Sequence, residues 1–211
     1  MKRLLFTVWL VITAQLAYSA DIKTLFVEMP DSIMPLLTKS NKLDFLDYAD
    51  MNMQAHATNK LGGVSNMADI KDDYLSLQMT SSSKVDMKLY YGKDSLLTIA
   101  IVETVCGGYC DSKITFYNEQ WEQLAIEDII ELPGIDDYLN RKAMRQTENR
   151  DAVGNMIYRM FEIDMLSEPE ILKVKLTSKD AITDDELRNT IIEREVISFR
   201  WNGKKFVRLK Q

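Results

Sequence analysis

The sequence has 211 residues, of which 46% are hydrophobic, 9% aromatic and 27% charged, with only 8 Gly and 4 Pro. This composition supports one or two globular domains and excludes a collagen-like, low-complexity or disordered chain. A formal net charge of −6 at pH 7 also disfavours binding to nucleic acid, which depends on clustered Lys and Arg that neutralise phosphates.

The first twenty residues have the pattern of a secretory signal peptide. Two basic residues precede an apolar run from Leu4 to Ala14, and small residues come directly before Asp21. As a helix this run is about 16 Å long, too short for a hydrocarbon core of about 30 Å. We therefore expect cleavage after Ser19 or Ala20, export to the periplasm or the cell exterior, and no transmembrane anchor afterwards.

Cleavage changes the charge of the chain. It removes Lys2 and Arg3, so that the mature chain keeps 24 of the 26 basic residues and all 32 acidic residues, a formal net charge of −8. The basic segment 200–210 alternates with apolar residues, as a half-buried strand with one wet face does. No nucleic-acid partner is expected.

Two helices are predicted at the start of the mature chain. Asp31 is a candidate N-cap for a helix with Pro35 in its first turn, where a missing N–H is tolerated. A second helix begins at Ser40 and continues to about Ala57, and Gly62 to Asp73 reads as a polar loop. The apolar positions of the second helix recur at spacings of three and four, namely Leu43, Leu46, Ala49, Met53 and Ala57.

From Tyr74 the hydrophobic period changes to two. This predicts half-buried strands over 74–79 and 85–90, in which Asp86, Lys88 and Tyr90 form the second face. The run 96–105 is more continuously apolar and suits a central strand. Segments 113–117 and 121–124 complete an antiparallel meander of four or five strands.

Helical patterns return after Gly134. They predict helices over 136–144 and 151–161, and a strand over 171–176. Thr183 and Glu186 form a capping box that opens a helix to about Glu193. The chain ends in a predicted hairpin, with strands 196–201 and 205–209 around Asn202-Gly203.

These elements predict an α+β fold with antiparallel sheets packed against helices. Residues 21–131 form a helical pair plus a meander, and residues 132–211 form helices plus the hairpin, either as a second unit or as one continuous domain. Segments 114–124 and 197–209 are similar in sequence. This similarity favours a duplicated helix-plus-meander unit, and a single continuous sheet is the alternative.

Four segments resemble a known family: the signal peptide, 29–31 with Leu36-Leu37, strand 112–117 and the closing 201–206. Together they are similar to an uncharacterised family of exported Bacteroidetes proteins, known only as a domain of unknown function. The resemblance spans nearly the whole mature chain and implies export and an α+β fold. Its motifs are turn and packing residues, so it implies no catalytic or binding residue.

Cys106 and Cys110 flank a glycine-rich turn. In an exported chain a disulfide is the default, and over so short a loop it would stabilise the hairpin by about 2 kcal/mol. Free thiols are the alternative. Redox chemistry is disfavoured because the usual redox pair has two intervening residues at a helix N-terminus.

We expect no metal and no cofactor. His56 is the only histidine and is expected to be a surface or capping side chain near a helix end. Met51 and Met53 resemble a thioether copper site, but Met occurs in almost every apolar stripe, which favours core filling. Asp47 and Asp50 lack the spacing of a calcium loop.

The sequence offers no nucleophile with a neighbouring base, so we expect a protein that is not an enzyme. The alternative is an exported hydrolase that uses a carboxylate pair from a larger set of acids, which includes Glu103, Glu119, Glu122 and Asp128.

Aromatic residues cluster on the predicted strands and are candidates to line a binding groove. The ligand-binding candidates are Tyr91, Tyr109, Trp121 and Trp201, with Tyr90 and Tyr117 nearby. We therefore expect a non-enzymatic binding or accessory module for a protein, peptide or small ligand. A small-ligand cavity protein and a structural protein of the cell envelope are further alternatives, and the oligomeric state is open.

Overall fold

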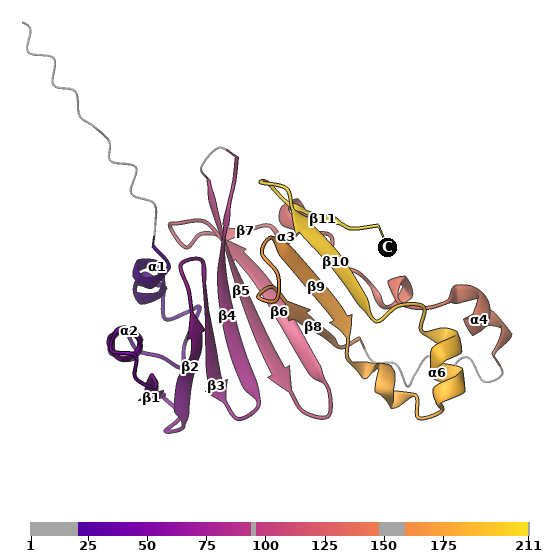
Figure 1. Ribbon diagram of the computed structural model, residues 1–211, viewed down its shortest axis with the longest axis horizontal. Helices are drawn as coiled ribbons and strands as arrows, with labels where there is room; N and C mark the ends of the chain where they lie inside the picture. The colour runs from indigo at the N-terminus through magenta and orange to yellow at the C-terminus, as the bar shows by residue number, and fades with distance from the viewer. Residues whose placement is uncertain (1–20, 94–95, 148–158, 211) are drawn as a thin grey trace, which may run out of the picture.

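The computed structural model describes residues 21–93, 96–147 and 159–210, and it has the predicted α+β architecture (Figure 1). A seven-stranded antiparallel sheet has the order β1-β2-β3-β4-β5-β6-β7. A four-stranded antiparallel sheet follows it in the chain, with the order β11-β10-β9-β8. The predicted leader 1–20 lies outside the described residues.

The strands of the large sheet are β1 (His56–Thr58), β2 (Val64–Ile70), β3 (Tyr74–Thr80), β4 (Ser83–Tyr91), β5 (Leu97–Cys106), β6 (Cys110–Tyr117) and β7 (Gln123–Leu124). Those of the small sheet are β8 (Phe161–Asp164), β9 (Ile171–Leu176), β10 (Val196–Trp201) and β11 (Phe206–Arg208). The helices are α1 (Ile22–Glu28), α2 (Lys39–Asp50), α3 (Ile126–Ile129), η1 (Ile135–Asp137), α4 (Arg141–Gln146), η2 (Ser178–Ala181) and α6 (Asp185–Ile191).

The predicted helix after Asp31 is wrong, because residues 31–37 form turns. The first helix instead begins directly after Asp21. Pro35 disfavours helical backbone at the residue before it, and the Ile33 N–H closes a turn onto the Pro30 carbonyl at 3.0 Å. In the sequence, α1 follows the predicted leader directly, so no turn or loop residue marks its start.

The second helix starts and ends earlier than predicted. Thr38 is its N-cap and forms a capping box with Asn41. The helix ends at Asp50, and Asn52 then adopts a left-handed backbone with φ of 55°. Residues to Ala57 therefore do not continue the helix, and the apolar stripe predicted for it is wrong in part, since Leu43 is 45% exposed.

The predicted loop 62–73 contains β2, which pairs with β1 and β3. Its large apolar residues Val64, Met67 and Ile70 recur every third position, and most of its side chains are exposed or half-buried, whereas Ser65 is buried. A strand with this spacing has no period-two alternation of apolar residues to reveal it.

The central meander is confirmed, although the sheet has seven strands rather than four or five. The expectation of a wet face on β4 is wrong, since Asp86, Lys88 and Tyr90 are all buried. They lie on the face that the small sheet covers. Sequence alternation distinguishes two faces but does not show that a second layer covers the polar one.

In the second half, strand 171–176 and the terminal hairpin are confirmed. The helix predicted over 136–144 is replaced by η1 and α4, with the Asn140 side chain accepting a hydrogen bond from the Ala143 N–H. The helix predicted over 151–161 lies almost entirely outside the described residues, and its last residue begins β8. Asp184 rather than Thr183 caps α6.

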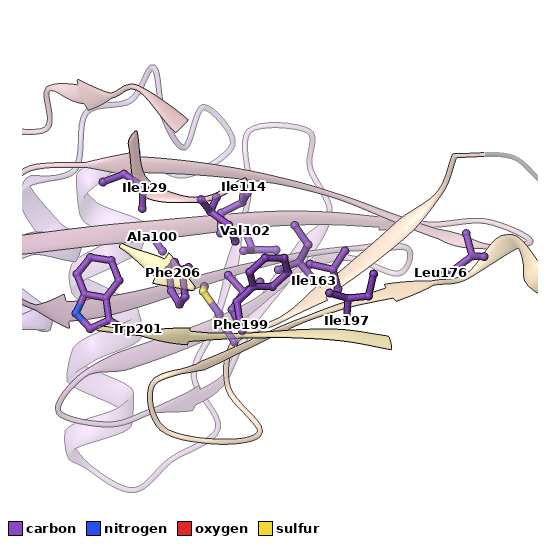
Figure 2. Packing of buried hydrophobic residues seen from close by; sticks show 14 of the residues in the cluster. Ala100, Val102, Ile114, Ile129, Ile163, Leu176, Ile197, Phe199, Trp201 and Phe206 are labelled. Carbon is purple, nitrogen blue, oxygen red and sulfur yellow. The ribbon is translucent and has the colours of Figure 1, made fainter. Parts of the chain in front are cut away.

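Two hydrophobic cores lie on opposite faces of the large sheet. One packs α1, α2 and the segment after α1 against β3, β4 and β5. The other fills the space between the two sheets, where Ala100 and Val102 of β5 meet Phe199 and Trp201 of β10 (Figure 2). The segment 129–138 contributes to this second core.

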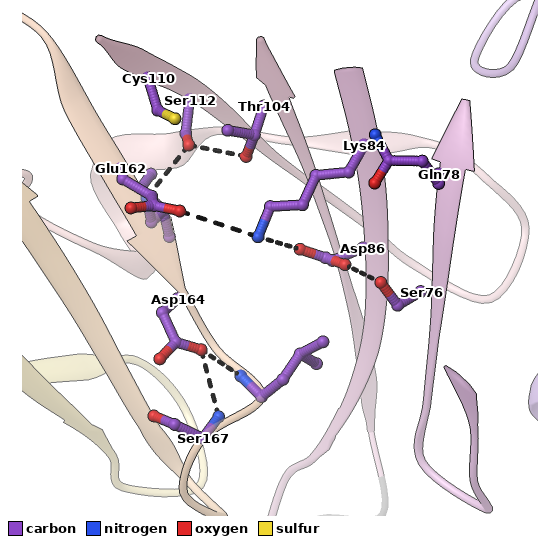
Figure 3. Close-up of polar contacts among 12 residues, drawn as sticks. Ser76, Gln78, Lys84, Asp86, Thr104, Cys110, Ser112, Glu162, Asp164 and Ser167 are labelled. Carbon is purple, nitrogen blue, oxygen red and sulfur yellow. Dashed lines mark hydrogen bonds and ion pairs between the residues drawn. The ribbon is translucent and has the colours of Figure 1, made fainter. Parts of the chain in front are cut away.

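Polar side chains also cross between the sheets (Figure 3). Ser76 donates a hydrogen bond to Asp86 at 2.6 Å, and the Lys84 ammonium lies 3.4 Å from Asp86 and 4.0 Å from Glu162 of β8. The Lys88 ammonium donates to the Met165 carbonyl at 2.9 Å, and burial lowers the pKa of Lys88. The small sheet is therefore docked by apolar packing and by specific polar contacts.

The edge strand β8 lies beside β6, whose side chains take up its backbone donors. Asp111 accepts the Phe161 N–H and Ser112 accepts the Ile163 N–H, each at 3.1 Å. The Thr177 hydroxyl donates to the Cys110 carbonyl at 2.6 Å. Side-chain oxygens thus replace the strand that would otherwise continue the small sheet.

Candidate peptide-binding groove

The four aromatic candidates do not form one groove. Trp201 is buried, with its indole N–H donating to the Tyr91 carbonyl at 2.9 Å. Tyr91 is half exposed at the end of β4, whereas Tyr109 lies in the turn at the opposite end of β5. Trp121 packs against Tyr117, with ring centroids 5.7 Å apart.

The predicted disulfide is present. Cys106 and Cys110 are directly paired across the β5–β6 hairpin, with Cα atoms 4.0 Å apart. It lies next to the β6 residues that hold β8, so it fixes the hairpin end on which the small sheet docks.

The remaining sequence candidates lie on the exposed segment between the end of α2 and β1. His56 is exposed on β1 rather than near a helix end, with its ring stacked on Tyr48. Met51 and Met53 are 66% and 56% exposed, so their assignment to the core is wrong. They follow the end of α2, where the chain turns away from the core.

The acidic candidates also fail to converge. Glu103 faces Lys113 on β6 at 4.0 Å, and Glu122 accepts a hydrogen bond from Asn118 in the β6–β7 turn. Glu119 lies in the same turn, and Asp128 lies on α3. These four described carboxylates thus occupy three separate places rather than one site.

A cavity of about 330 Å³ lies between β11 and the segment 127–133. Its apolar lining comes from Ile130, Leu132, Pro133, Phe199, Phe206 and Val207, and its charged lining from Glu127, Glu131, Asp137, Lys205 and Arg208. We call this cavity the β11 groove. Its volume is in the lower part of the range typical of ligand pockets.

β11 is an edge strand with an open side. The Leu209 N–H bonds to the Ser198 carbonyl at 2.8 Å, and the Asn202 N–H to the Lys205 carbonyl at 3.1 Å. Because bonded pairs alternate in an antiparallel ladder, the backbone groups of Phe206 and Arg208 face away from β10. Within the described part of the chain, no strand or side chain bonds to these groups.

Elsewhere in the two sheets, some outward-facing backbone groups are capped by side chains. At the end of β2, the Asp69 carboxylate accepts the Ile70 N–H at 2.9 Å. Asp111 and Ser112 close β8 in the same way. Natural sheets commonly blunt their edges, so an unblunted strand beside a cavity marks a candidate binding surface.

The charges of the β11 groove are unequally engaged. Arg208 donates to Asp137 at 2.7 Å, and this bond holds the pKa of Asp137 below its usual range. The Gly134 N–H also donates to Asp137 at 2.8 Å. The carboxylates of Glu127 and Glu131 have no hydrogen bond or ion pair to any described residue, which leaves them available to a ligand.

The sequence could not single out this groove. The Asn-Gly turn revealed the hairpin, but only the strand order shows that β11 is an edge. Likewise, Glu127 and Glu131 are two of 32 acidic residues in the sequence, and only the fold places them opposite β11.

Within residues 21–93, 96–147 and 159–210, no group of three or more His, Cys, Asp or Glu side chains could hold a metal ion. No helix in these ranges has the length and apolarity needed to cross a membrane.

The fold defines this chain as an α+β protein with two packed antiparallel sheets. Residues 14–206 match the model of the family described as protein of unknown function (DUF3256), and the chain belongs to this family. No curated protein matches it. A solved domain of an uncharacterised protein from Porphyromonas gingivalis W83 is 21% identical and has a TM-score of 0.77, covering 90% of this chain and 98% of that one. That organism belongs to the Bacteroidetes, in agreement with the resemblance inferred from the sequence.

Proposed function

We propose that this protein is an exported, non-enzymatic binding module that takes up an extended segment of another protein along β11. The observation that carries the proposal is the open backbone of Phe206 and Arg208 beside the β11 groove. Strand addition to an exposed sheet edge is a recurrent mode of peptide recognition, in which main-chain hydrogen bonds supply affinity and pockets supply specificity.

Export is supported by the leader pattern of residues 1–20 and by the disulfide, which persists best in oxidising compartments. A binding role rather than catalysis is supported by the separation of the candidate carboxylates described above. A peptide is favoured over a compact small ligand because the backbone groups of β11 repeat along a strand.

The test uses residues 21–211 with the disulfide intact, immobilised and exposed to a random heptapeptide library displayed on phage. We expect peptides to be enriched by the natural chain. Arg208→Pro removes an outward-facing N–H and leaves the bonds to β10 intact, a substitution that edge strands tolerate. Arg208→Ala is the matched control, since it loses the same side chain but keeps the N–H.

Enrichment that survives in Arg208→Ala and is lost in Arg208→Pro supports strand addition. Absence of enrichment, or equal enrichment by both variants, overturns it. If Arg208→Pro does not fold, amide hydrogen exchange of the natural chain decides instead. An enriched peptide must then slow exchange at Phe206 and Arg208, and unchanged exchange there counts against the proposal.

A further inference from the structure

We propose that the β11 groove selects a Lys or Arg side chain of the bound segment, with Glu127 and Glu131 as its recognition residues. This inference rests on the proposed function and adds the chemistry of the partner. It follows from the direction in which a strand paired with β11 would point its side chains.

Residues directly opposite each other on neighbouring strands place their side chains on the same face of the sheet. Phe206 and Arg208 both line the β11 groove, and the Arg208 side chain reaches Asp137 in the same lining. The residues of an added strand that lie opposite Phe206 and Arg208 therefore direct their side chains into the groove. Intervening residues point to the face of Val207, which borders the rim of the groove and is 45% exposed.

The lining of the groove fits a long side chain with a positive end. Ile130 and Leu132 offer apolar surface for an aliphatic stem, and Glu127 and Glu131 offer carboxylates for the charged head. Lys and Arg bury their stems along apolar surface in this way while the head stays near water. An acidic side chain would meet two carboxylates of like charge.

The other charges of the groove compensate these two carboxylates only in part, because Lys205 supplies a single positive charge. Asp137 and Arg208 are bonded to each other. A second copy of the chain is a poorer occupant than a foreign segment. Its own Arg208 would have to leave Asp137 before it could reach Glu127 or Glu131.

The experiment uses three libraries of acetylated, amidated pentapeptides, randomised except for a central Lys, norleucine or Glu. Norleucine keeps most of the aliphatic stem and removes the charge. We expect the natural chain to retain the Lys library about fivefold better than the norleucine library, as for a partly screened ion pair. The Glu library should be retained least. The preference for Lys should shrink as the salt concentration rises from about 0.05 M to about 0.5 M.

The Glu127→Gln and Glu131→Gln double variant should lose the preference for Lys and still retain the norleucine library. The matched control is Glu119→Gln with Asp128→Asn, which makes the same change of charge outside the groove lining. It should keep the preference. Equal retention of Lys and norleucine by the natural chain, or an unchanged preference in the Glu127/Glu131 variant, overturns the inference.

These results separate the two proposals. Retention that depends on the Arg208 N–H but shows no preference for Lys overturns only the basic-residue inference. If no library is retained, both the basic-residue inference and the proposed function fail. Sedimentation of the natural chain alone should show a monomer, and a dimer abolished by Arg208→Pro would assign β11 to a second copy and overturn both.

Discussion

The two edges of the small sheet differ in how their backbone groups are satisfied. At β8, Asp111 and Ser112 accept the outward N–H groups of Phe161 and Ile163, and the edge is buried against the large sheet. At β11, the outward groups face a cavity. One edge of this sheet therefore serves assembly of the fold, whereas the other has no structural partner in the described chain.

The largest expected difference between the two edges comes from truncating one apolar side chain at each of them. Ile163→Ala should lower the free energy of unfolding by about 2–4 kcal/mol, because Ile163 is 2% exposed between the sheets. Val207→Ala should change it by less than about 0.5 kcal/mol, because its side chain already contacts water. Chemical denaturation measures both. Similar losses at the two positions would contradict the distinction between the edges.

A smaller effect is expected from removing one acceptor at the closed edge. Ser112→Ala deprives the Ile163 N–H of its partner and should cost about 1–3 kcal/mol. Hydrogen exchange of the Ile163 amide should also be faster in the Ser112→Ala variant. Ser198→Ala on β10 is the matched control, since its backbone carbonyl still accepts the Leu209 N–H, and it should be nearly neutral. Unchanged exchange at Ile163 would show that the Ser112 oxygen does not close this edge.

How far the sequence predicts these features depends on the range of the interaction. The β5–β6 hairpin, the disulfide and the Asn-Gly hairpin were predictable because turn chemistry and pairing within a hairpin are local. Strand β2, which lacks apolar alternation, and the buried Lys88 were not, since their surroundings depend on segments distant in sequence. The Lys88 ammonium, for example, bonds to the carbonyl of Met165.

The same limit explains the candidate site. Aromatic residues were reasonable candidates from composition, but Trp201 proved to be part of the core between the sheets. Glu131 and Arg208 come from distant parts of the chain and line one cavity only in the folded protein. The internal repeat stays a prediction. Its two segments do share a turn in which an Asn side chain, Asn118 or Asn202, accepts backbone N–H groups.

The smallest expected effect concerns the ion pair between Arg208 of the open edge and Asp137. Arg208 lowers the pKa of Asp137 below its ordinary value of 3.8 in the folded protein. The unfolded chain therefore binds more protons between the folded pKa and 3.8, so stability rises with pH across this window. The contribution of Asp137 is present above the window and is lost as the pH falls through the folded pKa.

Because both side chains are more than one third exposed, this contribution should be less than about 1 kcal/mol. Asp137→Asn should be less stable than the natural chain at neutral pH, and the difference should shrink below pH 3.8. Arg208→Met should remove most of the same pH dependence, since the hydrogen bond from Arg208 is the largest cause of the lowered pKa of Asp137. Denaturation at a series of pH values measures both variants. A constant difference across the acid range would mean that β11 is held by its ladder to β10 alone, and that Arg208 is available to a bound segment.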